Sequence, residues 1–358
     1  MVEKASMEKL RPPDGYADLV ILAEDYFNTT VSKIEPLKGD GSDRSIYRIH
    51  LMKDQQSSIV GVIHQNVSEN RDFFLLTKKF QETGLPVPHL FTINAKETAY
   101  LMQDLGPYTL AEKVAVWNRE NRHQEIIAAY QLVLDCLFRI QRGLPPILTE
   151  FLLTRKMDVS VYQTDLDYFK SAFMDWFGFS SLLNQAVRYE LQAILVDQLS
   201  HLATDYFVYR DFQARNIMWL DGAPWFIDYQ SAFLGPCFYD LASLLYGSRS
   251  GLNEPMRDSL VSYYFGLLKS SSPLSFERYQ ELFLYFVVLR RLRSLGSYGY
   301  LYGVKGKRDF YASISPTLKE LSGLFRSQPS LKRYAHLSGM IQALQEIWQQ
   351  HEETSGSR

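Results

Sequence analysis

The first hundred residues alternate between short apolar runs and polar clusters. Residues 16–28 place apolar side chains at helical spacing, which predicts a short helix. Residues 34–64 instead show alternating or β-branched runs separated by Gly, Asp and Ser clusters, which indicates a meander of strands. An amphipathic segment follows, with Ser68 as the expected N-cap and Gly84 as the C-terminal stop. Two more strands are expected within 85–106, so this part is predicted to be a small sheet with one amphipathic helix.

From about residue 108 the pattern becomes helical, and only residues 208–230 interrupt it with strand signals. The apolar run LFLYFVVL at 282–289 is too short to cross a membrane and is predicted to lie in a buried helix. We therefore predict an α+β protein with a β-rich lobe of residues 1–105, a larger helical lobe of residues 106–358, and a ligand site in the cleft between them. The expected helices lie near 124–142, 160–178, 182–204, 254–270, 277–299, 308–326 and 330–350.

The composition is typical of a soluble globular protein, because 46% of the 358 residues are hydrophobic and 22% are charged. The formal net charge is −2, so neither nucleic acid nor an anionic membrane surface is an expected partner. Cys136 and Cys237 lie far apart and lack metal-binding spacing, which favours free thiols in a reducing compartment. The first residues contain no apolar stretch of the signal-peptide kind, and we expect a cytoplasmic protein.

The stretch that interrupts the helical pattern, residues 208–230, reads VYRDFQARNIMWLDGAPWFIDYQ. Its dipeptide Asp221-Gly222 suits a two-residue hairpin turn between two short apolar strands. Such a hairpin would bring Asn216, before the first strand, and Asp228, after the second strand, to the same open end.

Asn216 and Asp228 carry the oxygen ligands that Mg²⁺ prefers when it also binds substrate phosphates. Asp211, on the loop before the hairpin, is then left to accept a proton from an incoming hydroxyl, as in protein-kinase phosphoryl transfer. The alternative is a hairpin in which the same side chains only cap turns. The spacing of Asp211, Asn216 and Asp228 together with the two-lobe layout favours the catalytic interpretation.

The chain resembles the aminoglycoside phosphotransferase and choline kinase superfamily, a branch of the protein-kinase-like fold. The resemblance depends first on YRDFQARNIMW at 209–219 and WFIDYQSAFLGPCFYDLASLL at 225–245. Within the superfamily, the chain is most similar to bacterial anomeric kinases that phosphorylate N-acetylmuramate and N-acetylglucosamine at C1. That similarity adds KGDGSDRSIYRI at 38–49, ETGLPVPHL at 82–90 and RRLRSLGSYGYL at 290–301, and so extends over most of the chain.

The resemblance implies roles for the residues that match the superfamily motifs. Asp211 is expected to be the catalytic base, and Asn216 and Asp228 the Mg²⁺ ligands. Asp240 matches the aspartate that supports the catalytic loop through hydrogen bonds, and Tyr209 and Arg210 belong to that loop. The first lobe is expected to bind ATP, with adenine held by the backbone between Gln103 and Leu105 and the phosphates held by the loop residues Gly41, Ser42, Asp43, Arg44 and Ser45.

The sequence departs from the kinase pattern at two positions. Tyr209 stands where most relatives have histidine, and because that histidine mainly positions the loop, we expect the tyrosine to be tolerated. The expected third strand, SIVGVIHQ at 58–65, carries no lysine for the nucleotide phosphates. The negative charge of the phosphates would then have to be neutralised by Mg²⁺ and Arg44, with Arg48 or Lys38 as further candidates.

We therefore predict an ATP- and Mg²⁺-dependent phosphotransferase that acts on a hydroxyl of a small molecule, most closely a sugar or amino sugar. The protein is expected to be a monomer or weak dimer. Gln230 supports the sugar-kinase group, since aminoglycoside phosphotransferases have an acidic residue there. The alternatives are an aminoglycoside or choline kinase and a pseudokinase that binds nucleotide without transferring phosphate.

Three arginines, Arg290, Arg291 and Arg293, interrupt an apolar helix and require polar partners. Acids of the helical lobe are one set of possible partners. A carboxylate on the substrate is the other.

Overall fold

The computed structural model describes residues 15–37, 43–52, 58–143, 150–269 and 274–355. The chain forms two compact units. Unit 1 comprises Met1–Pro107 together with Trp225–Gln230, and unit 2 comprises Tyr108–Pro224 together with Ser231–Arg358. Unit 1 thus contains a short segment from the middle of the chain, which the predicted division at residue 105 does not include.

Unit 1 contains a five-stranded antiparallel sheet with the strand order β1-β2-β3-β5-β4. The predicted meander is therefore present. The strand expected at the start of 85–106 begins only at Leu90, because Pro86 and Pro88 have no N–H to donate to a neighbouring strand. The strands are β1 (Val31–Leu37), β2 (Ser45–Leu51), β3 (Ser58–Ile63), β4 (Leu90–Ile93) and β5 (Ala99–Gln103).

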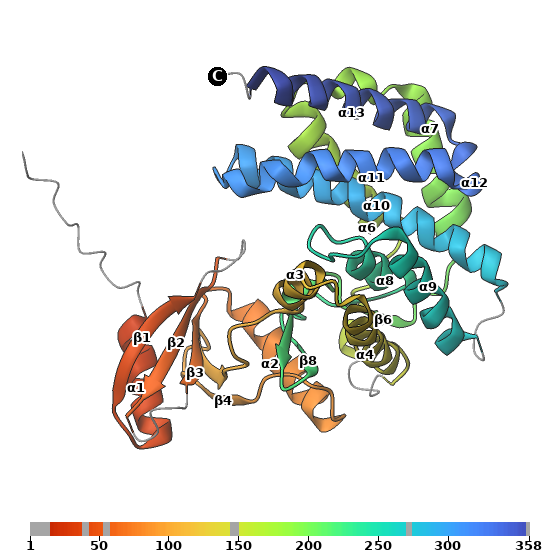
Figure 1. Ribbon diagram of the computed structural model, residues 1–358. Helices are drawn as coiled ribbons and strands as arrows, with labels where there is room; N and C mark the ends of the chain where they lie inside the picture. Colours follow the sequence, from red (N-terminus) through yellow and green to blue (C-terminus); the bar gives the residue numbers. More distant parts are fainter. Residues whose placement is uncertain (1–14, 38–42, 53–57, 144–149, 270–273, 356–358) are drawn as a thin grey trace, which may run out of the picture. The chain divides into compact units, whose positions relative to one another are not determined.

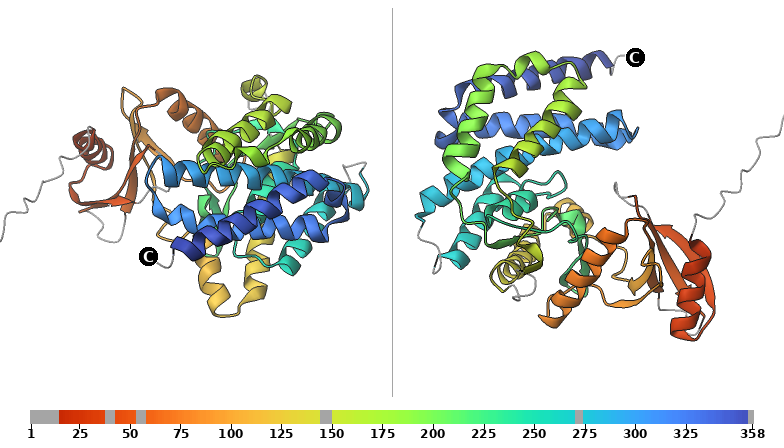
Figure 2. Two further views of the ribbon diagram at one scale, coloured as in Figure 1. Left: turned by 90° about the horizontal axis from the view of Figure 1, so that it is seen from above. Right: turned by 180° about the vertical axis from the view of Figure 1, so that it is seen from behind.

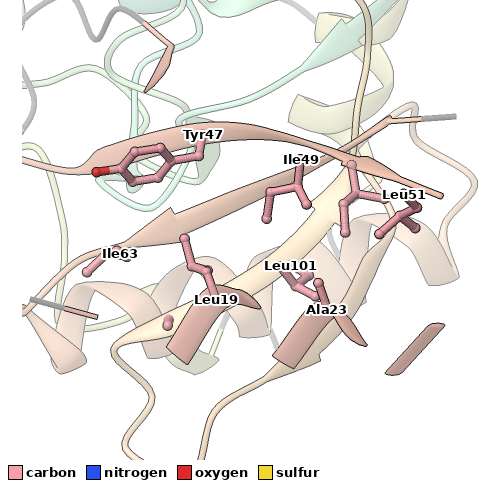
Figure 3. Close-up of a cluster of buried hydrophobic side chains, with 9 residues drawn as sticks. Leu19, Ala23, Tyr47, Ile49, Leu51, Ile63 and Leu101 are labelled. Atoms are coloured by element: carbon pink, nitrogen blue, oxygen red, sulfur yellow. The ribbon is translucent and has the colours of Figure 1, made fainter. Parts of the chain in front are cut away.

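Helix α1 (Tyr16–Phe27) covers one face of this sheet. Leu19 and Ala23 are fully buried against side chains of β2, β3 and β5, which alternate between the two faces of the sheet (Figure 3). Alternation places Leu101 on the α1 face and its neighbour Tyr100 on the opposite face. Tyr100 there packs against Phe73 of α2 (Val67–Glu82), with ring centroids 5.4 Å apart.

The N-cap of α2 was predicted at Ser68, and that prediction is wrong. The side chain of Asn66 accepts a hydrogen bond from the Glu69 backbone N–H, and Ser68 lies inside the first turn. Asparagine is as good an N-cap as serine, so composition alone did not separate the two positions.

Unit 2 is mostly helical, and its longest helix, α10 (Phe276–Gly303), packs against several of the others (Figure 1). Helix α13 (Ala335–Ser355) packs against both α11 (Ile314–Ser327) and α7 (Gln185–Ala193), and the right view of Figure 2 shows these helices side by side. The other elements of this unit are α3 (Leu110–Arg119), α4 (His123–Arg142), α6 (Val159–Phe169) with the π-helical η1 (Lys170–Asp175), η2 (Ser180–Leu182), α7 (Gln185–Ala193) with the π-helical η3 (Ile194–Leu199), η4 (Ala214–Asn216), α8 (Phe238–Leu245), α9 (Glu254–Leu268), η5 (Arg308–Ser313), α11 (Ile314–Ser327), α12 (Pro329–Lys332) and α13 (Ala335–Ser355).

The predicted hairpin is present as β7 (Ile217–Leu220) and β8 (Ala223–Phe226), which pair with each other. Asp221 and Gly222 have φ angles of 51° and 78°, so both central residues adopt the left-handed conformation of a tight hairpin turn. A second short ladder joins β6 (Tyr206–Val208) to β9 (Phe233–Gly235). The loop after β6 carries the predicted catalytic residues.

Two further predictions about the helical part are confirmed. Residues 282–289 are all buried within α10, as expected for the run LFLYFVVL. Cys136 and Cys237 are free thiols, the first half-buried and the second buried. Among the described helices, none combines the length and the apolar character that a membrane span requires.

A close helix contact fixes the position of α10 against η1. A Cβ atom at Gly299 would overlap the carbonyl oxygen of Ala172, so a residue without a side chain is required there. The same helix carries the three arginines whose partners the sequence left open.

We predict that Gly299→Ala lowers the free energy of unfolding by roughly 1–3 kcal/mol, because the added methyl group must separate two backbones. Gly323→Ala is the matched control, since a Cβ atom at this α11 position meets nothing within 4 Å. The control is expected to be neutral or to stabilise by up to about 1 kcal/mol through helix propensity. Urea unfolding measures both, and equal stability of the two variants would contradict this account of the contact.

Candidate active site

The loop that follows β6 is held by one buried carboxylate. Asp240, in the first turn of α8, is fully buried. Its Oδ2 accepts a hydrogen bond from the backbone N–H of Tyr209 (2.6 Å), and its Oδ1 accepts one from the backbone N–H of Arg210 (3.0 Å). Arg210 has a φ angle of 77°, which costs on the order of 1–3 kcal/mol for a residue with a Cβ atom. The two hydrogen bonds offset that cost and hold the backbone immediately before Asp211.

The carboxylate of Asp211 faces a buried cation. Its Oδ1 lies 4.0 Å from Nη2 of Arg290, a side chain that is 6% exposed. Arg290 is itself fixed, because it donates to the hydroxyl of Tyr239 (2.5 Å) and to Oγ of Ser243 (2.9 Å). The guanidinium of Arg290 thus places a fixed positive charge beside the Asp211 side chain.

Asn216 is brought next to Asp211 within unit 2. It ends the short helix η4, and its Nδ2 donates to the backbone carbonyl of Asp211 (2.8 Å). The amide is therefore held through its nitrogen, which is the arrangement that a metal ligand using the amide oxygen requires.

Asp211 lines an open pocket of unit 2 that contains about 660 Å³ of space, counted out to the solvent at its mouth. The charged residues in the lining are mostly arginines. Four arginines and two aspartates contribute, and the remaining residues are mainly polar. The pocket is therefore expected to repel cations and to attract anions. Its charged side chains are Asp211, Arg215, Arg249, Arg290, Arg293 and Asp309.

The arginines of α10 find protein partners, as their burial requires. Arg291 donates to the carbonyl of Tyr246 and to Thr317, and forms an ion pair with Glu320 at 2.8 Å. Arg293 lies 3.3 Å from the carboxylate of Asp165. Because Arg291 is turned toward α11, it acts in packing, whereas Arg290 and Arg293 reach the pocket that contains Asp211.

Asp228 belongs to unit 1, where its neighbour Tyr229 anchors the segment. The Tyr229 ring stacks on Phe73 at 5.2 Å, and its hydroxyl lies 2.5 Å from Oγ1 of Thr77. Asp228 has a φ angle of 71°, a left-handed conformation that aspartate tolerates better than most residues. Its side chain is 37% exposed.

Arg44, at the start of β2, connects Asp228 to helix α2. Its Nη1 donates to Oδ1 of Asp228 (3.1 Å), and its Nη2 donates to Oε1 of Glu69 (2.5 Å). Gln230 donates to the same two acceptor oxygens. Arg44 was predicted from the sequence, whereas Glu69 was not. The signal available was an acidic residue in the first turn of the helix that follows the lysine-free strand.

Arg48 was a further candidate for binding the phosphates, but in the structure its side chain binds groups of the protein itself. Its guanidinium donates twice to Asp104, at 2.5 and 3.0 Å, and once to the carbonyl of Gly106. Arg48 therefore holds the segment that connects the sheet to the rest of the chain. Lys38 lies outside the described residues.

The other predicted nucleotide-binding residues are only partly described. Gly41 and Ser42 lie outside the described residues, whereas Asp43 and Ser45 flank Arg44 at the start of β2. The backbone N–H of Gln103, at one end of the segment that reaches Leu105, donates to the carbonyl of His89 (2.8 Å).

The two predicted metal ligands carry the kinds of oxygen that a hard cation prefers. Asn216 of unit 2 has an amide oxygen and Asp228 of unit 1 has carboxylate oxygens, and Mg²⁺ prefers both kinds together with phosphate oxygens. Within the described ranges, no group of three or more His, Cys, Asp or Glu side chains is arranged to hold a metal.

Comparison with known proteins identifies the family. The model of the family described as "phosphotransferase enzyme family" matches residues 33–274. An N-acetylmuramate/N-acetylglucosamine kinase of Neisseria meningitidis is 31% identical over 144 residues, which is 39% of this chain and 41% of that relative. The chain thus matches less than half the length of this relative.

A second N-acetylmuramate/N-acetylglucosamine kinase, from Pseudomonas aeruginosa, is 21% identical over 89% of this chain and 91% of its own length. Among solved structures, the ADP-bound aminoglycoside phosphotransferase APH(2'')-Ib is similar with a TM-score of 0.58. It is 12% identical and covers 84% of this chain and 96% of its own. At this identity the match shows the fold, which confirms the predicted protein-kinase-like α+β class.

The buried carboxylate of Asp240 makes the stability of the protein depend on pH. Burial raises the pKa of Asp240 to about 7, although the N–H donors of Tyr209 and Arg210 act in the opposite direction. Between the unfolded value of 3.8 and about 7, the folded chain binds a proton that the unfolded chain does not. This contribution to stability is therefore complete below pH 4 and is lost as the pH rises through 7.

We predict that the free energy of unfolding of wild type, minus that of Asp240→Asn, falls by on the order of 2–3 kcal/mol from pH 5 to pH 8, because each pKa unit corresponds to about 1.4 kcal/mol. Urea unfolding of both proteins across this range gives the difference directly. A difference that does not vary with pH would show that Asp240 remains ionised in the folded chain.

Proposed function

Because the chain belongs to the phosphotransferase enzyme family, we propose that it transfers the γ-phosphoryl group of ATP to a hydroxyl of an amino sugar. The observation that supports this most strongly is the pocket of unit 2, where the Asp211 carboxylate lies beside Arg290 in a lining rich in arginine. The names of the two relatives, both N-acetylmuramate/N-acetylglucosamine kinases, agree with such an acceptor.

Asp211 acts as the general base in this proposal. Its carboxylate accepts the proton of the acceptor hydroxyl while the oxygen attacks the γ-phosphorus, the bond to the β-phosphate oxygen breaks, and ADP leaves. Arg290, whose Nη2 lies 4.0 Å from Oδ1 of Asp211, helps to position this carboxylate. The rate enhancement comes largely from positioning, because phosphoryl transfer requires little covalent chemistry from the protein.

In this proposal, Asn216 and Asp228 would hold Mg²⁺. The metal, when bound, neutralises charge that develops on the β- and γ-phosphate oxygens. Unit 1 binds the nucleotide, with adenine against the segment from Gln103 to Leu105. The phosphates are assigned to Asp43, Arg44 and Ser45 together with Gly41 and Ser42, the last two of which lie outside the described residues.

The charge of the pocket separates the proposed acceptor from one alternative. Aminoglycosides and choline are cations, and they require an acidic pocket. The pocket that contains Asp211 has four arginines against two aspartates, which disfavours a cation and suits a neutral or acidic sugar. The second alternative is a pseudokinase. A protein that transfers no phosphate does not require a carboxylate beside a cation in an open pocket, so the position of Asp211 disfavours this alternative.

Replacing the base tests the mechanism. We predict that Asp211→Asn lowers kcat on N-acetylmuramate or N-acetylglucosamine by about 100-fold or more, while the affinity for ATP stays near that of wild type. Asp221→Asn, in the hairpin turn, is the matched control, because asparagine adopts the left-handed conformation equally well. A coupled assay of ADP release measures both. Turnover by Asp211→Asn at the wild-type rate would exclude Asp211 as the base.

The acceptor class is tested with a panel of substrates. We expect kcat/KM for N-acetylmuramate or N-acetylglucosamine to exceed that for kanamycin and choline by at least about 100-fold, since like charges brought together cost several kcal/mol. Comparable turnover of kanamycin would favour an antibiotic kinase. Binding of ATP with Mg²⁺ but no turnover of any acceptor would favour the pseudokinase.

A further inference from the structure

One guanidinium in unit 1 holds two carboxylates together. Arg44 is 8% exposed in its side chain and donates through Nη1 to Asp228 and through Nη2 to Glu69. The two acids outnumber the one base, so this group of side chains carries a formal charge of −1. We call Arg44, Glu69, Asp228 and Gln230 the Arg44 cluster.

The Arg44 cluster is rigidly supported on the side of Asp228. Gln230 is 6% exposed, and its Nε2 donates to Oε1 of Glu69 (3.0 Å) and to Oδ1 of Asp228 (2.9 Å). Tyr229, which lies between Asp228 and Gln230 in the sequence, is fully buried against α2. The carboxylates of Glu69 and Asp228 are therefore held on either side of one arginine.

Strand β3 offers no lysine for the same purpose. Strand β3 contains no basic residue, and the histidine that follows it, His64, is occupied by Asn70 through Nδ1 at 2.8 Å. The other ring nitrogen of His64 lies 4.0 Å from Glu69. Arg44 is a cation of unit 1 in direct hydrogen-bonding contact with Asp228.

We propose that Arg44 binds a phosphate of the nucleotide, that Glu69 positions it for this task, and that Asp228 exchanges Arg44 for Mg²⁺ when the nucleotide binds. The inference rests on the proposed function, because it assigns residues to the ATP site. Oδ1 of Asp228 already accepts hydrogen bonds from both Arg44 and Gln230, so a metal ion that binds this oxygen has to displace one of the two donors. When Asp228 turns to the metal, Nη1 of Arg44 becomes available for phosphate oxygens, while Nη2 stays on Glu69.

The chemistry of arginine fits this exchange. A guanidinium presents several donors in one plane, so it can keep one carboxylate and take up a phosphate on its other edge. Glu69 is then a positioning residue, because it acts through Arg44. In the state seen here, Arg44 neutralises Asp228, which lowers the repulsion that an incoming polyphosphate would otherwise meet.

The proposal is tested by the affinity for ATP, measured by calorimetry with excess Mg²⁺ and again with a chelator. We expect Arg44→Met to weaken binding of ATP with Mg²⁺ by about tenfold or more, as loss of a charge-assisted hydrogen bond predicts. Glu69→Gln should weaken it less. Arg71 lies on the same helix as Glu69 and forms an exposed ion pair with Glu97, so Arg71→Met is expected to leave the affinity unchanged.

The exchange at Asp228 has a signature that a static ion pair lacks. With the chelator present, Asp228→Asn should bind ATP more tightly than wild type, because Arg44 no longer has to leave a carboxylate. The tightening should be smaller when the same substitution is made in the Arg44→Met background. An equal or larger tightening in that background would show that Arg44 stays on Asp228, and the exchange would be refuted. Adenosine, which has no phosphate, should bind all variants like wild type.

The outcomes separate this inference from the proposed function. If the wild-type protein binds ATP and phosphorylates a sugar but Arg44→Met binds ATP like wild type, only the inference fails. If the wild-type protein does not bind ATP in the presence of Mg²⁺, both fail.

Discussion

The candidate site depends on the buried carboxylate of Asp240, which accepts two backbone hydrogen bonds from the loop before Asp211. Those hydrogen bonds offset the free-energy cost of the left-handed conformation of Arg210. Helix α8 carries Asp240, and α10 carries the Arg290 that faces Asp211. The packing of α8 against α10 therefore determines where the side chain of Asp211 lies. The strain at Arg210 is stored where the chemistry is proposed to occur.

Unit 1 uses the same principle for Asp228. This residue also adopts a left-handed conformation, and a buried aromatic neighbour, Tyr229, fixes the backbone around it. Arg44 then connects the carboxylate to Glu69 of α2. In both units an acid is aimed by groups that are themselves buried and hydrogen-bonded, which is how a site built on loops obtains a defined geometry.

The sequence predicted the features that local rules control. The Asp221-Gly222 hairpin, the strand meander and the buried run in α10 follow from turn chemistry and from hydrophobic periodicity. Features that depend on residues distant in sequence were missed. The Arg44–Glu69 contact spans 25 positions and the Arg44–Asp228 contact spans 184, and neither leaves a periodic signal. The grouping of Trp225–Gln230 with unit 1 was missed for the same reason.

The central claim is that Asp211 receives the proton of a sugar hydroxyl. A crystal structure of the protein with Mg²⁺, a non-hydrolysable ATP analogue and N-acetylmuramate tests it most directly. The account predicts a sugar hydroxyl within hydrogen-bonding distance of the Asp211 carboxylate, about 2.6–3.2 Å, and the metal on Asn216 and Asp228. A sugar bound with no hydroxyl near Asp211, or a metal held by other side chains, would contradict it.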